Sequence, residues 1–230
     1  MIRKAVLSCL VVALLVGIWA LPIAAFSTAD YEITISAGYT AQSTESDLQV
    51  WRSSDGYSNI NIGVAPNEKG INYARVRRGQ LQALQDSFKE QLEAGFAELA
   101  SRGISAEFEI EKTEIKTVGQ YKALYFLVYN NMTYVGKTTA TTQHSYNFSS
   151  KNKVYSITFS TTHADGRADA EMNAMVESFV IKDELFATSS AGRRVLMGTA
   201  IGAVVGGAVG GVMAWQNKKK KESTSADEAV

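Results

Sequence analysis

The sequence has few of the residues that form cross-links, metal sites or kinks, since its 230 residues include one cysteine, two histidines and two prolines. The cysteine, Cys9, lies in an apolar run at the N-terminus, so the rest of the chain has no disulfide and no thiol chemistry. The sequence contains no nucleophile-elbow motif, and no glycine-rich phosphate loop follows a predicted strand. We therefore expect no catalytic residue, no cofactor and no enzyme activity.

The chain also lacks a net charge, but its 23 acidic and 23 basic side chains are unevenly distributed. Residues 28–192 carry 20 acidic and 15 basic side chains, a net charge of −5, which argues against nucleic acid as a partner. The other eight basic residues flank two apolar runs; they are Arg3, Lys4, Arg193, Arg194, Lys218, Lys219, Lys220 and Lys221. Basic residues at the ends of an apolar run are the signal that sets membrane topology.

The apolar run near the C-terminus, Val195–Trp215, contains no charged side chain. A helix of its 21 residues is about 31 Å long, which matches the hydrocarbon core of a bilayer. We predict a transmembrane helix that holds the protein in the lipid bilayer, preceded by a polar stalk at 183–194 and followed by a tail at 216–230. The lysines of the tail place it in the cytoplasm.

The N-terminus predicts a secretory signal peptide at residues 1–27. A short basic segment is followed by the apolar run Ala5–Ala20, and Ala25-Phe26-Ser27 offers small residues for cleavage near Ser27. The alternative is an uncleaved anchor, because the apolar residues up to Phe26 are also long enough to span a bilayer. The segment before Cys9 is loosely similar to a lipoprotein box, but the apolar run continues past it. Either hypothesis places the middle of the chain outside the cytoplasm.

Between the apolar ends, at 28–182, hydrophobic residues alternate with a strand period in some segments and a helix period in others. The predicted strands are 31–36, 48–52, 59–64, 107–111, 121–129, 134–148 and 154–161. A closing helix is expected at 166–179. The segment 121–129 is apolar on both faces, which indicates a central strand that is covered on both sides.

A long amphipathic helix separates the first three strands from the last four. Its apolar residues recur at spacings of three and four, which is the period of one buried stripe. They are Leu81, Leu84, Phe88, Leu92, Phe96 and Leu99. Gly103 follows directly after the last polar residue and is expected to cap the C-terminus of the helix. The helix begins between Asn72 and Leu81, where Gly79 interrupts the pattern.

This order of elements resembles the PsbP-like α/β/α sandwich superfamily. The matching segments are NINIGVAP before the long helix, VGQYKALYFLVYN after it, KVYSITFSTT as the late strand and VESFVI at the end of the closing helix. The resemblance covers residues 31–182, and the predicted C-terminal transmembrane helix is an addition to that fold. It implies an α+β domain in which an antiparallel sheet is packed against both helices. Members of the superfamily are mostly binding or accessory modules without a common ligand, so the resemblance assigns no site residues.

Two charged clusters are candidate partner patches. Glu107, Glu109 and Glu111 alternate along one predicted strand, where they could bind a divalent cation or a basic partner. The alternative, which we favour, is a solvated outer face. The second cluster lies before the long helix and consists of Arg75, Arg77 and Arg78. Cations at this end oppose the helix dipole, so we expect carboxylates of the same chain to compensate them, with an anionic lipid surface or partner as the alternative.

The two histidines do not predict a metal site. The expected hairpin turn at 149–153 would pair His144 with about Ile157 and not with His163, and no cysteine is available to complete a zinc site.

Asn131 and Asn147 each begin a glycosylation sequon, which matters only in a eukaryotic host. We expect Asn131, near a strand end, to be the more accessible of the two.

Four glycines at a spacing of four lie on one stripe of the predicted transmembrane helix; they are Gly198, Gly202, Gly206 and Gly210. Small residues at this spacing allow two helix backbones to approach closely, so the stripe is a candidate packing face for a homo-oligomer or another membrane protein. The alternative is that glycine is simply common in membrane helices. If the stripe packs, replacing Gly202 and Gly206 with leucine should weaken self-association in a membrane two-hybrid assay. Unchanged association would remove the packing hypothesis.

The sequence therefore predicts a single-pass protein of the cell membrane with an extracytoplasmic α+β domain and a cytoplasmic C-terminus. The hypothesis we favour is a non-catalytic binding or accessory module of the cell envelope, whose partner is another envelope protein or a small ligand. The alternative is a structural or assembly subunit that oligomerises through the glycine stripe. A membrane-bound enzyme is the third and weakest hypothesis.

Overall fold

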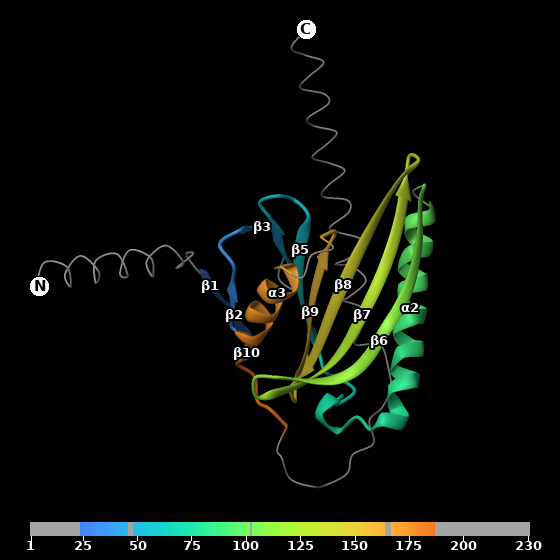
Figure 1. Ribbon diagram of the computed structural model, residues 1–230. Coiled ribbons are helices and arrows are strands. Elements are labelled where there is room, and N and C mark those ends of the chain that lie inside the picture. Colours follow the sequence, from blue (N-terminus) through green and yellow to red (C-terminus); the bar gives the residue numbers. More distant parts are fainter. Residues whose placement is uncertain (1–23, 46–47, 102, 164–166, 187–230) are drawn as a thin grey trace, which may run out of the picture.

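The computed structural model describes residues 24–45, 48–101, 103–163 and 167–186 (Figure 1). Most of the predicted signal peptide, most of the stalk, the helix predicted at 195–215 with its glycine stripe, and the tail lie outside these residues. None of the helices in the described ranges is long and apolar enough to cross a membrane.

The described residues form ten strands, two 3₁₀ turns and two α-helices. In chain order they are β1 (Ala24–Ser27), β2 (Tyr31–Ile35), β3 (Tyr39–Glu45), β4 (Leu48–Ser53), β5 (Ser58–Pro66), η1 (Tyr73–Arg75), η2 (Arg78–Gln80), α2 (Leu81–Ser101), β6 (Ile104–Val118), β7 (Tyr121–Tyr134), β8 (Lys137–Ser149), β9 (Lys153–Thr161), α3 (Arg167–Glu177) and β10 (Val180–Ile181). Every strand and helix that the sequence predicts in these ranges is present.

The strands form two antiparallel sheets. Seven strands pair in the order β3-β4-β5-β9-β8-β7-β6, so the N-terminal hairpins join the later strands through the β5–β9 pair. A second sheet of three strands has β2 between β1 and β10. The sequence predicts one sheet, and the prediction that β2 belongs to it is wrong, because Ala24–Ser27 and Val180–Ile181 pair with both edges of β2 and keep it apart from the larger sheet.

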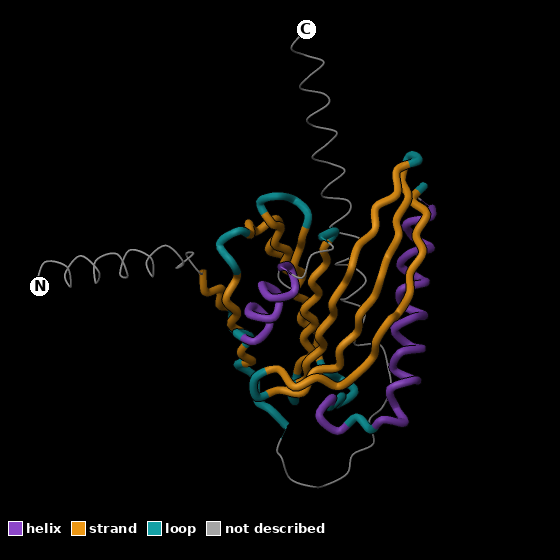
Figure 2. Tube along the Cα trace, viewed as in Figure 1, coloured by secondary structure: helices purple, strands orange, loops and turns teal. Residues whose placement is uncertain are grey.

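Two apolar cores lie on opposite faces of the seven-stranded sheet, so the domain has three layers (Figure 2). Helix α2 packs on one face, over apolar side chains of β6 and β7 such as Leu124, Phe126 and Val128. Helix α3 and the three-stranded sheet pack on the other face, where Met172 and Ile33 meet side chains of β5, β7, β8 and β9. The sheet is therefore covered on both sides, as an α/β/α sandwich requires.

Helix α2 follows its sequence pattern closely. Its buried residues are Leu84, Phe88, Leu92, Phe96 and Leu99, which belong to the predicted stripe. The helix ends at Ser101, and Gly103 adopts a left-handed conformation with φ of 78° while its N–H donates to Ala100 O at 3.0 Å. This is the conformation that glycine adopts at least cost, so the predicted C-cap is confirmed.

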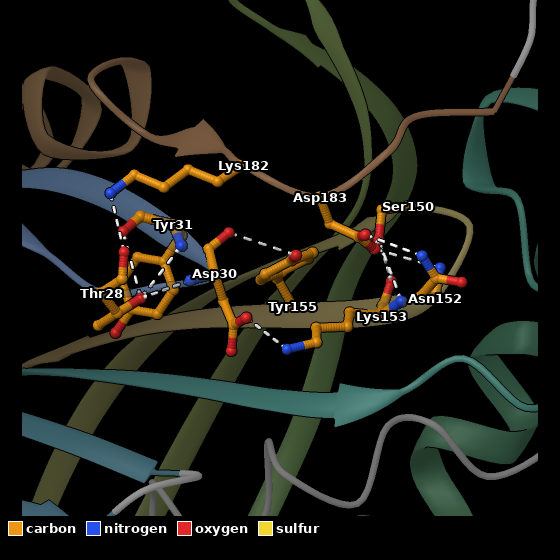
Figure 3. A network of polar contacts seen from close by, with 9 residues as sticks. All are labelled: Thr28, Asp30, Tyr31, Ser150, Asn152, Lys153, Tyr155, Lys182 and Asp183. Carbon is orange, nitrogen blue, oxygen red and sulfur yellow. Dashed lines mark hydrogen bonds and ion pairs between the residues drawn. The ribbon is translucent and has the colours of Figure 1, made fainter.

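The segment that leaves the domain is tied to two turns by polar contacts (Figure 3). Asp183 accepts hydrogen bonds from Ser150 Oγ and from Asn152 Nδ2 in the β8–β9 turn. Lys182 N–H donates to Asp30 O at 2.9 Å, and Asp30 forms an ion pair with Lys153. Ordered contacts thus extend into the first residues of the predicted stalk, and they fix the point at which the chain departs from the domain.

Candidate functional site

One region of the seven-stranded sheet is buried but polar. It lies on the face that α2 packs against, next to the apolar strip of β6 and β7, and it covers three neighbouring strands, β8, β9 and β5 (Figure 1). The register places three rows of side chains across these strands. The rows are Asn147, Ser156 and Gly63; Ser145, Thr158 and Asn61; and Gln143, Ser160 and Asn59. We call these nine positions the polar face.

The polar face carries amides and hydroxyls and no charged side chain. Eight of its nine residues are buried, among them Gln143 and Asn147 at 0% exposure and Asn61 at 2%, and Asn59 is half-buried. The adjacent strand β7 presents Leu124, Phe126 and Val128 to α2 in the same three rows, so the change from apolar to polar side chains occurs between β7 and β8.

Hydrogen bonds within the polar face satisfy only part of its polar groups. Ser145 Oγ and Thr158 Oγ1 bond to each other at 2.9 Å, and Asn61 Nδ2 donates to Asn59 Oδ1 at 3.0 Å. Five buried atoms have no hydrogen-bond partner among the described residues. They are Asn61 Oδ1, Gln143 Nε2, Asn147 Oδ1, Ser156 Oγ and Ser160 Oγ.

The free-energy cost of these five atoms is large. A buried polar group without a partner costs about 1–3 kcal/mol, so the polar face would cost about 5–15 kcal/mol. That is as large as the whole stability of an ordinary domain, about 5–15 kcal/mol. The described residues therefore leave the hydrogen bonding of this face incomplete. This makes the polar face the candidate binding site.

A titratable cluster lies on the opposite face of the sheet. Tyr125 Oη and His144 Nδ1 are 2.9 Å apart, and His144 Nε2 lies 3.5 Å from Asp169 Oδ1 of α3, without a hydrogen bond. Lys116 Nζ sits 3.7 Å from the centroid of the Tyr125 ring, a cation–π contact. Burial lowers the pKa of His144 below its usual value; Lys116 acts in the same direction and Asp169 opposes both.

We expect this histidine to make stability sensitive to acid. Because its pKa is lower in the folded protein than in the unfolded chain, the unfolded chain binds more protons as the pH falls below about 6.5, and stability decreases. The midpoint of thermal unfolding should therefore drop from pH 7.5 to 5.5, and His144→Gln should reduce the drop. His163→Gln is the matched control, since His163 is half-exposed and its Nε2 lies 3.1 Å from Asp55 Oδ2. Equal drops in wild type and His144→Gln would contradict the assignment.

The structure does not bring the two predicted charged patches together. Glu107, Glu109 and Glu111 are exposed on β6, and Phe108 and Ile110 between them turn toward α2, as a solvated outer face requires. The arginines lie in and beside η1 and η2, before α2 begins, where Arg75 is half-buried and Arg77 and Arg78 are exposed. The compensation of the arginines by carboxylates stays a prediction.

The histidines and the sequons occupy different environments. His144 pairs with Phe159, two residues from the expected position, so the histidines are separated as predicted. Among the described residues, no three histidine, cysteine or carboxylate side chains gather in a way that could hold a metal ion. Asn131 is exposed, although within β7 and not at its end, whereas Asn147 is fully buried and part of the polar face.

Comparisons with known proteins give a likeness in fold only. No protein-family model and no curated protein matches the chain. The solution structure of cyanobacterial PsbP (CyanoP) from Synechocystis is similar with a TM-score of 0.50 at 12% identity, covering 72% of this chain and 95% of that one. The chain has the PsbP-like α/β fold, and the likeness shows nothing beyond the fold.

Two further solved structures are similar at lower TM-scores. A protein of Bacteroides thetaiotaomicron is 10% identical with a TM-score of 0.41; the match covers 67% of this chain but only 46% of that one, so this chain spans less than half of its length. LpqN of Mycobacterium tuberculosis, described as involved in cell envelope biogenesis, is 12% identical with a TM-score of 0.29, and the match covers 69% of this chain and 82% of that one.

Proposed function

We propose that the protein is a non-catalytic binding module of the cell envelope, held at the membrane with its α+β domain on the extracytoplasmic side. The observation that carries the proposal is the polar face, where five buried hydrogen-bonding atoms lack partners among the described residues. A site of this kind binds through hydrogen bonds, and it contains neither a nucleophile with an adjacent base nor a metal-ligating cluster among its nine positions.

The membrane part of the proposal rests on the sequence. The apolar run Val195–Trp215 between Arg194 and Lys218 has the length and flanking charge of a transmembrane helix. The polar contacts of Asp183 hold the start of the predicted stalk against the domain. The full-length protein should remain in the membrane fraction after washing with alkaline carbonate, and its release by that wash would contradict the anchor.

The binding role is tested by what co-purifies with the full-length chain. We expect mass spectrometry of protein solubilised from membranes to find a protein or small molecule that is absent from the Asn61→Leu/Gln143→Met variant, because both substitutions replace an amide of the polar face with an apolar side chain of similar length. The control is Thr40→Ala, an exposed hydroxyl on β3. Circular dichroism shows whether each variant is folded. Identical co-purifying material in folded wild type and double variant would refute a binding role for this face.

The alternative of an assembly subunit depends on the glycine stripe at 198–210 and not on the polar face. It predicts that Gly202→Leu/Gly206→Leu abolishes self-association, whereas the polar-face variant leaves self-association unchanged. Measuring co-purification and self-association for both the polar-face variant and the glycine variant therefore distinguishes a binding module from an assembly subunit.

A further inference from the structure

Four loops meet at the end of the domain where the chain leaves it. They are 28–30, 67–80, 150–152 and 182–184. Backbone hydrogen bonds of 2.7–2.9 Å connect them, from Lys182 to Asp30, from Lys151 to Glu184 and from Asn67 to Asn152. We call these four loops the exit end. The chain leaves the domain at its lower end in Figure 1, where η1 and η2 also lie, and the β7–β8 hairpin forms the upper end.

The exit end is basic, although the domain as a whole is acidic. Its loops carry six basic and four acidic side chains, a net charge of +2, whereas residues 28–192 together have a net charge of −5. The basic residues are Lys69, Arg75, Arg77, Arg78, Lys151 and Lys182, and the acidic residues are Asp30, Glu68, Asp183 and Glu184. Asp30 is already paired with Lys153 of β9, outside these loops. Positive charge is therefore concentrated at the end from which the chain departs.

Arg77 and Arg78 present this charge to solvent. Both residues are exposed, and neither forms an ion pair with a residue that the structure describes. They precede α2, whose first turn has no acidic residue and whose dipole has the same sign at this end. No carboxylate of the described ranges thus contacts the pair, which favours an anion outside the domain.

The segment between the domain and the predicted transmembrane helix limits which end of the domain can stand on a membrane. Nine peptide steps join Phe186 to Val195, and a fully extended chain covers at most about 30 Å in nine steps. The domain is longer, since the 13 residues of β8 alone span about 40 Å at the rise of a strand. The domain therefore cannot stand on the bilayer on its β7–β8 hairpin, whereas it can stand on the exit end.

We propose that the exit end rests on the anionic phospholipid headgroups of the membrane that holds the protein, with Arg77 and Arg78 as the contact. The inference rests on the membrane anchor of the proposed function. A guanidinium group can donate two parallel hydrogen bonds to one phosphate, so adjacent arginines suit phospholipid headgroups. The attraction of an anionic surface reaches about 10 Å at 0.1 M salt. The contact orients the domain, with the β7–β8 hairpin directed away from the bilayer.

The experiment measures how closely each end of the domain approaches the headgroups. Full-length protein is reconstituted in nanodiscs of phosphatidylcholine or of an equimolar mixture with anionic phosphatidylglycerol, each with some phosphatidylcholine that carries a headgroup nitroxide. A bimane label, which the nitroxide quenches only at short range, is attached in a Cys9→Ser chain at Ala74→Cys or at Ala140→Cys. Both alanines are exposed, Ala74 in η1 beside the arginines and Ala140 on β8 toward the hairpin. We expect phosphatidylglycerol to increase quenching at position 74 and to leave quenching at position 140 weak.

Charge substitutions connect the quenching to the two arginines. Arg77→Gln/Arg78→Gln should lower the ratio of docked to undocked domain about thirtyfold, because each basic residue near an anionic surface changes it about fivefold. Lys89→Gln/Lys112→Gln is the matched control, since it removes two exposed positive charges outside the exit end, and it should leave quenching unchanged. Salt at about 1 M, where the Debye length is about 3 Å, should reduce quenching of the wild-type chain as the arginine substitutions do.

The outcomes separate the lipid contact from the anchor. Release of the full-length protein by alkaline carbonate refutes the anchor, and the inference fails with it. If the protein stays anchored but the label at position 74 is quenched equally in both kinds of disc, the inference is overturned while the anchor stands, and the exit end has another occupant, such as an acidic partner protein. Stronger quenching at position 140 than at position 74, or equal quenching in the folded arginine variant and wild type, also overturns it. Circular dichroism shows whether each variant is folded.

Discussion

Replacing Phe126 with alanine should lower the free energy of unfolding by about 3–5 kcal/mol. Phe126 is fully buried in β7, and its ring stacks on Phe88 of α2 with the centroids 4.0 Å apart. The substitution removes the ring contact that joins the long helix to the sheet and leaves a cavity that the surrounding strands cannot close. Urea unfolding of the full-length protein, followed by circular dichroism, measures the change.

The control for Phe126→Ala lies three residues along the same strand. Tyr129 is 43% exposed on the opposite face of β7, so Tyr129→Ala should cost well below half as much. The Asn61→Leu/Gln143→Met variant leaves no cavity in the apolar core, so it should not lose stability through lost packing. The comparison separates loss of packing from loss of binding. Equal effects of Phe126→Ala and Tyr129→Ala would show that α2 does not pack on β7 as described.

Much of the fold was predictable because most elements show a clear hydrophobic period. The stripe of α2 and the two-sided apolar pattern of 121–129 led directly to a helix on a central strand. Three strands were not predicted, and each has a physical reason. β10 has only two residues, β3 is a polar edge strand from Tyr39 to Glu45, and β1 lies inside the apolar segment that the sequence identifies as a signal.

Turn chemistry explains where strand bounds were missed. β7 and β8 form one hairpin joined by Val135 and Gly136, with φ of 50° and 72°. Two residues with positive φ are typical of a tight hairpin turn, but valine is rarely found in this conformation, so residue types alone do not predict a turn here. The strand predicted at 107–111 continues to Val118 in the structure. A bulge between Ile110 and Lys112 shifts the alternation of side chains, so the strand period does not extend across it in the sequence.

The candidate site could not be predicted from the sequence, although its residues were inside predicted strands. In β8 and β9 the amides and hydroxyls alternate with apolar residues, a pattern that ordinarily indicates one buried face and one solvated face. Only the pairing of β5 with β9 places Asn61 beside Thr158 and turns these residues into one buried surface. That pair joins segments almost 100 residues apart, and nothing local in the sequence specifies it.

Strand β1 leads to an expectation about signal cleavage. A cut near Ser27 would remove most or all of β1, which pairs with β2 along its whole length. Phe26 lies 4.9 Å from the ring of Trp51 in an edge-on contact, and it also packs against Tyr31. We expect the mature protein to retain β1, either through cleavage before Ala24 or because the anchor is uncleaved, and mass spectrometry of the N-terminal peptide identifies which.

A chain that begins at Thr28 should be less stable than one that begins at Ala24 by about 2 kcal/mol. The burial of half a phenylalanine side chain accounts for about 1 kcal/mol, and its edge-on contact with Trp51 adds about 0.5–1.5 kcal/mol. The ladder hydrogen bonds add little, because ordering four residues costs about as much as those bonds contribute. Phe26→Ala in the longer chain should reproduce most of the loss, whereas Ala25→Gly, at an exposed position, should not. If the mature protein begins at Thr28 and is as stable as the longer chain, β1 contributes nothing to the domain and the signal ends where the sequence alone predicts.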